Sequence, residues 1–244
     1  IVPKTFLPNT NEFYEARWFT SAAQGTPATV VIDGEEFPFG ADLIFPADNL
    51  PGCVIGIEVC EDLWAVNPPS GRLALAGARI LLNLSASNVL IGKADDRSLL
   101  CASQSARAMA AYVFTASGWG ESTTDLAWDG QATIHELGAC IASGPRFSME
   151  AHLTIADIDV ERIGLDRLRT GTFADCARVE ARRAGEDDHI GRLLIVEEDA
   201  PTGPHGDLLR PLDRFPFVPD DPARLDQDCY EAFNIQVQGL MRRM

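Results

Sequence analysis

The sequence predicts an α/β fold, with helices and strands alternating along most of its 244 residues. Residues 53–59 and 78–84 (ARILLNL) are short, almost continuously apolar runs of the kind found in buried strands. Between the second run and a further strand at residues 113–117 lies an alanine-rich pattern, residues 95–112, that predicts a helix. Strands separated by helices favour a parallel sheet, and the second run indicates a strand covered on both faces.

The N-terminal part predicts smaller elements. Residues 4–19 pass from an extended segment with a proline into a helical turn capped by Asn9 or Asn11, with Phe13, Trp18 and Phe19 on its buried side. An Asp-Gly turn predicts a hairpin of residues 29–32 and 35–39. Further elements follow in order: a strand at 40–45, a short helix at 70–77, a hairpin pair at 131–136 and 139–143, entered from an Asp129-Gly130 turn, and a last strand at 153–160.

Beyond residue 161 the composition becomes more charged. The patterns predict helices at 166–169, 174–184 and 227–244, a strand at 193–196, and an extended arm over residues 199–228, which are rich in Pro, Asp and Gly. We therefore expect two parts, residues 1–161 and 162–244. The chain begins at Ile1 in what reads as the end of a strand and stops in an unfinished helix, so we expect a piece of a longer protein.

Charge and cysteine content exclude several classes of function. A net charge of −16 disfavours nucleic acids and anionic membranes as partners, and no apolar run is long enough to cross a bilayer. The six cysteines form no CxxC pair and lack the spacing of a zinc site or a disulfide framework. We expect no metal and a reducing, cytoplasmic location.

The candidate site is centred on Cys60, which follows the strand predicted at residues 53–59. Glu61, Asp62 and Trp64 come directly after it, so a rigid strand delivers a thiol to a sharp polar turn. Such a turn can also supply backbone N–H groups for an oxyanion. The alternative is that Cys60 is a buried packing residue, as free cysteines often are.

Two further segments carry polar groups to strand ends. Lys4 lies at a strand-to-loop junction, and residues 85–88 (SASN) follow the strand at 78–84, where they would meet Cys60 if the two strands are neighbours. The alternatives are a solvated charged surface for Lys4, Glu12, Glu15 and Arg17, and a helix cap or turn for residues 85–88.

Together these motifs resemble the nitrilase superfamily of Cys-Glu-Lys amidases, and within it the glutaminase domain of glutamine-dependent NAD⁺ synthetases. The resemblance covers most of the chain, and GESTTDLAWDG is its most family-specific motif. It implies a nitrilase-like α-β-β-α sandwich, partial here, followed by an extended arm. The motifs that carry the resemblance are KTFLPNTNEFYEARWF (4–19), GIEVCEDLW (56–64), LLNLSASN (81–88), QSARAMAAY (104–112), GESTTDLAWDG (120–130) and RPLDRFPFVPDD (210–221).

The resemblance also implies roles for individual residues. Cys60 would be the nucleophile that attacks the carboxamide of glutamine, and Lys4 would supply a cation beside the thiolate and the oxyanion, together with the Glu61 backbone N–H. Glu61 and Ser87 would bind the substrate. Glu12 matches an additional active-site glutamate, with Glu15 as a near competitor.

Other expectations concern parts beyond this sequence. The family's general-base Glu precedes the Lys, so a missing N-terminal segment would supply it and this chain alone would be inactive. ATP and Mg would bind an absent synthetase domain that amidates deamido-NAD, and we expect no cofactor here. We further expect a homo-oligomer, with residues 119–128 in an ammonia route or a subunit contact. The alternatives are another nitrilase-like amidase or carbamoylase, or a non-catalytic docking module.

Overall fold

A computed structural model describes residues 1–121, 126–184, 191–194, 206–212, 221–241 and 243. The chain forms two compact units, Ile1–Arg210 and Pro211–Met244. Helices α3 (Val160–Arg169) and α4 (Gly171–Ala184) belong to the first unit, where α4 contacts α1 (Pro69–Leu75). A functional domain boundary at residue 161 stays a prediction.

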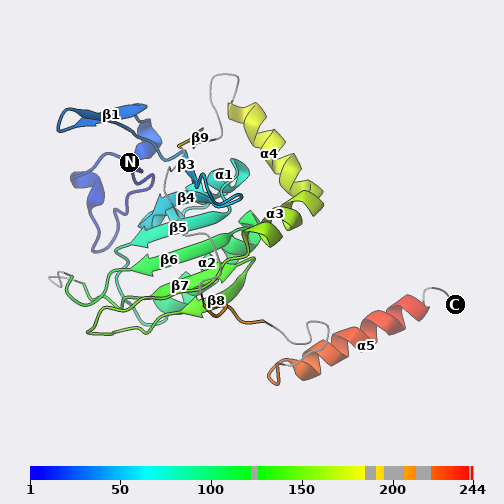
Figure 1. The fold of residues 1–244 in the computed structure, drawn as a ribbon. Helices are drawn as coiled ribbons and strands as arrows, with labels where there is room; N and C mark the ends of the chain where they lie inside the picture. The colour runs from blue at the N-terminus through cyan, green and yellow to red at the C-terminus, as the bar shows by residue number, and fades with distance from the viewer. Residues whose placement is uncertain (122–125, 185–190, 195–205, 213–220, 242, 244) are drawn as a thin grey trace. The chain divides into compact units, whose positions relative to one another are not determined.

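The first unit is built on a sheet of seven strands in the order β8-β7-β6-β5-β4-β3-β9 (Figure 1). Strands β4, β5 and β6 run parallel to one another at its centre, as the alternating pattern predicted. Strands β3, β7 and β8 join antiparallel, and β9 pairs parallel with β3. The bounds are β3 Leu43–Pro46, β4 Val54–Val59, β5 Ile80–Ser85, β6 Ala111–Ala116, β7 Ala132–Glu136, β8 Ala139–Ser143 and β9 Arg192–Leu193.

Helices α1 and α2 (Lys93–Ala108) pack against the sheet: α1 against β4 and β5, and α2 against β6 and β7. Small and aliphatic side chains of α1 and α2 meet Leu81, Tyr112 and Phe114 in the buried core. Helix α2 ends before Met109, whose left-handed backbone turns the chain into β6. The helix predicted over 95–112 is confirmed, although its last residues belong to that strand.

Strand β5 is covered less fully than predicted. Leu81, Asn83 and Ser85 are buried, whereas Leu84 on the opposite face is 53% exposed. The prediction of coverage on both faces is therefore wrong for the described residues. Apolar composition shows that a strand can be buried, but the elements that cover it come from elsewhere in the fold.

The N-terminal predictions are confirmed in part. Strands β1 (Thr29–Ile32) and β2 (Glu35–Pro38) form the expected hairpin. The helical turn is a pair of short 3₁₀ segments, η1 (Glu15–Arg17) and η2 (Ala22–Gln24). Trp18 and Phe19 are 66% and 65% exposed, so their predicted burial is wrong.

The strand predicted at 153–160 is also wrong. Residues 151–159 have no regular secondary structure, and the Asp159 side chain caps α3 by accepting from the Arg162 N–H. The Asp157 N–H instead donates to the Leu209 carbonyl (2.9 Å), and the Asp157 side-chain carboxylate accepts from the Leu209 N–H (2.5 Å). In addition, β7 and β8 are joined at Leu137-Gly138, where both residues have positive φ, which suits the tight turn.

The second unit contains α5 (Leu225–Met241). Tyr230, Phe233 and Leu240 are exposed within it. Of the arm predicted over 199–228, residues 199–205 and 213–220 lie outside the described residues. No helix in the described part of the chain is long and apolar enough to cross a membrane.

Candidate active site

Cys60 lies where β4 ends and a short 3₁₀ segment, η3 (Cys60–Trp64), begins. Its φ of 53° is in the left-handed region, which costs a non-glycine residue about 1–3 kcal/mol. Its side chain is buried, and its strand is flanked by parallel β5. A strained, buried thiol at the carboxyl end of a central strand is typical of a nucleophile held in a fixed position.

A buried polar network supports the turn from beneath. The Asn83 amide accepts from the Cys60 N–H (3.2 Å) and donates to the Cys60 carbonyl (3.4 Å), so it holds the backbone on both sides of the thiol. The amide also donates to the Tyr112 hydroxyl (3.1 Å), which donates to Glu58. Burial raises the pKa of both Glu58 and Tyr112 above their ordinary values.

Lys4 is placed beside this turn by the N-terminal segment. Its ammonium forms an ion pair with Glu15 at 2.6 Å. The N–H groups of the next two residues, Thr5 and Phe6, donate to the buried carboxylate of Asp62 in η3. The structure therefore holds the segment that follows Lys4 against the turn containing Cys60, and it pairs the Lys4 ammonium with Glu15. The role of Lys4 beside the thiolate stays a prediction.

Glu12 occupies a different part of the site. It accepts a hydrogen bond from the Asn88 amide, whose oxygen accepts from the ammonium of Lys93. Lys93 also lies 5.7 Å from the centre of the Trp64 ring. Asn88 therefore links the predicted Glu12 to a cation that the sequence reasoning did not select.

Lys93 had two signals in the sequence. It is the first residue of α2, where a positive charge opposes the helix dipole and needs another reason to be present. It is also one of the two lysines in the 244 residues, and the other is Lys4. Burial lowers the pKa of Lys93, while Glu12, Cys60 and Glu61 act on it in the opposite direction.

The carboxyl group of Glu61 is influenced by the charges of both lysines, Lys4 and Lys93. Burial raises the pKa of its carboxyl, and the nearby charges of Lys4 and Lys93 oppose that rise. One carboxylate near two cations makes a site suited to a small molecule that carries both charges, such as an amino acid.

Ser87 is buried after β5, and its hydroxyl accepts from Arg97 (3.1 Å). Arg97 is fully buried, donates to the backbone oxygens of Ser87 and Asn88 (3.2 and 2.6 Å), and pairs with Asp129 at 3.0 Å. Residues 85–88 are therefore held rigidly next to Cys60, because β5 and β4 are parallel neighbours. Their position is confirmed, and the binding role of Ser87 stays a prediction.

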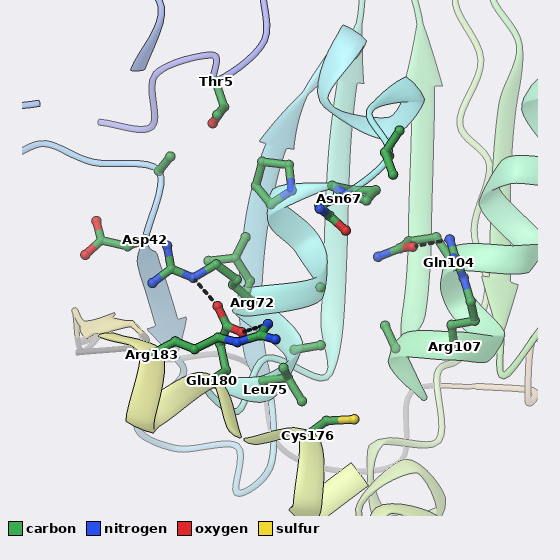
Figure 2. Close-up of a pocket in the computed structure, with 18 of the residues that line it drawn as sticks. Thr5, Asp42, Asn67, Arg72, Leu75, Gln104, Arg107, Cys176, Glu180 and Arg183 are labelled. Carbon is green, nitrogen blue, oxygen red and sulfur yellow. Dashed lines mark hydrogen bonds and ion pairs between the residues drawn. The ribbon is translucent and has the colours of Figure 1, made fainter. Parts of the chain in front are cut away.

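A separate cavity of about 1220 Å³ lies between α1, α2, α4 and the N-terminal segment (Figure 2). Glu180 pairs there with Arg72 (3.5 Å) and with Arg183 (3.6 Å), and Arg107 donates to the neutral amide of Gln104 (3.1 Å). Cys60, Lys93 and Glu61 do not line it. The residues predicted from the sequence gather at the strained Cys60 turn rather than in this cavity, so that turn is the candidate site.

Two further expectations concern the loop at residues 119–128 and metal binding. Trp119 is exposed on the loop after β6, but residues 122–125 of that loop lie outside the described residues. Among the described residues, no group of three His, Cys, Asp or Glu side chains could hold a metal ion.

The fold is that of a carbon–nitrogen hydrolase. A carbon–nitrogen hydrolase from Helicobacter pylori G27 superposes with a TM-score of 0.53 over 74% of this chain and 58% of its own, at 19% identity. A glutamine-dependent NAD(+) synthetase from Cytophaga hutchinsonii matches with the same TM-score over 63% of this chain and 24% of its own, at 30% identity. No protein-family model matches the chain.

The comparison with known sequences narrows the class of protein to which the chain is related. The chain is 50% identical over all 244 residues to the glutamine-dependent NAD(+) synthetase of Mycobacterium tuberculosis. It spans 35% of the length of that relative. The chain is therefore a homologue of glutamine-dependent NAD(+) synthetases and corresponds to part of such a protein, which confirms the resemblance seen in the sequence.

Proposed function

We propose that this chain forms the glutamine-hydrolysing part of a glutamine-dependent NAD⁺ synthetase. The observation that carries the proposal is the buried Cys60, strained at the end of β4 and followed directly by Glu61, on which the charges of Lys4 and Lys93 both act. The relatives' name and the carbon–nitrogen hydrolase fold support it. In this role the chain supplies ammonia to another part of the full-length protein.

The proposed reaction begins at Cys60. The Cys60 thiolate attacks the side-chain carbonyl carbon of glutamine, and the oxyanion is stabilised by Lys4 and the Glu61 N–H. The carbon–nitrogen bond then breaks, the amide nitrogen takes up a proton, and ammonia departs. The glutamyl group stays bound to Cys60 as a γ-glutamyl thioester. Water attacks this thioester, which releases glutamate and regenerates the thiol.

The remaining side chains bind substrate or move protons. Glu61 is suited to the α-ammonium of glutamine, with Ser87 nearby on the rigid loop after β5. Glu12 is our candidate for proton transfer, and its contact with Asn88 places it on the same side as Lys93. Glu15 remains its competitor because it holds the ammonium of Lys4.

The rest of the reaction belongs to the full-length protein. Relatives are longer than this chain, so we assign the general-base Glu and the ATP- and Mg-dependent amidation of deamido-NAD to segments outside it. A cytoplasmic homo-oligomer is part of the same proposal, and so is a role for residues 119–128 in ammonia transfer or subunit contact. These 244 residues alone should then lack wild-type glutaminase activity.

Covalent labelling tests the proposal. A diazo-ketone analogue of glutamine should modify Cys60 in the full-length protein, with the labelled peptide identified by mass spectrometry. Excess glutamine should protect the thiol, whereas a simple amide such as propionamide should not. Equal protection by propionamide would instead favour a general amidase, and labelling that persists in Cys60→Ala would exclude Cys60 as the nucleophile.

A further inference from the structure

We propose that Asp62 is a positioning residue, which holds the backbone just after Lys4 against the backbone just before Cys60 and so sets the reactivity of the thiol. The inference rests on the proposed function, because it assigns Asp62 an effect on chemistry through Lys4. It concerns a side chain that neither touches the proposed substrate nor carries out a step itself.

The hydrogen bonds of Asp62 carry the inference. Its Oδ1 accepts from the backbone N–H groups of Phe6 (2.7 Å) and Thr5 (3.1 Å), which directly follow Lys4. Its Oδ2 accepts from the N–H of Val59 (3.0 Å), which directly precedes Cys60. One carboxylate thus joins two segments that lie 56–57 residues apart in the sequence.

The burial of the Asp62 carboxylate explains why it needs these hydrogen bonds. Asp62 is 1% exposed, and a buried carboxylate is costly unless hydrogen bonds satisfy it. The bond to Val59 alone would suffice to cap η3. The bonds to Thr5 and Phe6 serve no such local purpose, so they are explained by the need to fix the Lys4 segment against the turn.

The consequence for chemistry is electrostatic. The ammonium of Lys4 lowers the pKa of a thiol only when it is held close, because the interaction falls with distance. Glu15 holds the ammonium, and Asp62 holds the backbone from which that side chain projects. Loss of Asp62 should therefore weaken the influence of Lys4 on Cys60 while both residues remain present.

The test uses the full-length protein and three variants: Asp62→Asn, Lys4→Met and the double variant. Asn keeps one acceptor oxygen and replaces the other with a donor, which opposes the N–H groups it faces. The rate of Cys60 alkylation by iodoacetamide is measured against pH, and glutaminase turnover is measured in parallel. We expect Asp62→Asn to move the alkylation midpoint to higher pH and to lower kcat about tenfold, with little further effect in the Lys4→Met background.

The outcomes separate the two proposals. An unchanged midpoint in Asp62→Asn, or full additivity with Lys4→Met, would overturn the role of Asp62. If Lys4→Met itself leaves both readouts unchanged, the proposed function of Lys4 fails instead. Asp62→Glu keeps the charge but displaces both oxygens, so it should give a smaller shift; it replaces Asp62→Asn in the test if thermal unfolding shows that the Asn variant is not folded.

Discussion

The Cys60 site and the cavity between α1, α2 and α4 lie in the same unit but differ in how their charged groups are arranged. In the cavity, which has a volume of about 1220 Å³, Glu180 pairs with Arg72 and Arg183. At the Cys60 site the turn is strained, and the charges of Lys4 and Lys93 both act on the carboxylate of Glu61, the residue directly after the thiol. Under the proposed function, strain and charge at a thiol mark the reactive site, whereas a large cavity whose acid and bases pair with one another does not.

The largest expected effect separates two cysteines. Cys60→Ala should lower glutaminase turnover by about 10³-fold or more, because the nucleophile is lost. Cys176→Ala, at the wall of the cavity, should leave turnover unchanged. Ammonia-dependent NAD⁺ synthesis by the same full-length proteins serves as the control and should survive both changes. A reversed pattern would move the chemistry to the cavity.

Lys4→Met should cost about 10²–10³-fold in kcat, the loss typical of one oxyanion-stabilising group. It should also raise the pH at which Cys60 becomes reactive, because a cation beside the thiolate is removed. Alkylation kinetics across a pH series measure the second effect. Arg107→Gln at the cavity is the matched loss of a cation and should change neither quantity.

A pair of variants decides between the two glutamates. Glu12→Gln keeps an oxygen that can accept from Asn88, so it should preserve the local structure but lower kcat by about 10²-fold if Glu12 transfers a proton. Glu15→Gln should instead slow the alkylation of Cys60 at a fixed pH, because Lys4 loses the partner that holds it. Wild-type turnover in Glu12→Gln would remove Glu12 from the proposed catalytic set.

The smallest effect concerns pH. Glu61 must be ionised to bind an α-ammonium, and burial raises the pKa of its carboxyl. Glutaminase kcat/KM should therefore begin to fall at a higher pH than an ordinary carboxyl would produce, by about tenfold for each pH unit below that pKa. Glu61→Gln should have a raised KM and should lack this acidic limb; an unchanged limb would assign it to another group.

Much of the site was already recognisable from local patterns. Apolar runs predicted β4 and β5. Cys60 follows the first strand and residues 85–88 lie at the end of the second, so they had to meet once these strands proved to be parallel neighbours. Lys93 was missed because its role depends on Asn88 and Trp64, which local periodicity does not relate to it. The strand predicted at 153–160 failed because an apolar pattern does not specify a pairing partner.

Local hydrophobic periodicity and turn chemistry were enough to predict the α/β class, the central strands and the thiol at a strand end. Three features became visible only in the folded chain: Glu15 pairs with Lys4, Asn88 links Glu12 to Lys93, and Asp62 joins two segments far apart in the sequence. The physical reason is that a hydrogen bond depends on distance and direction between groups that only folding brings together.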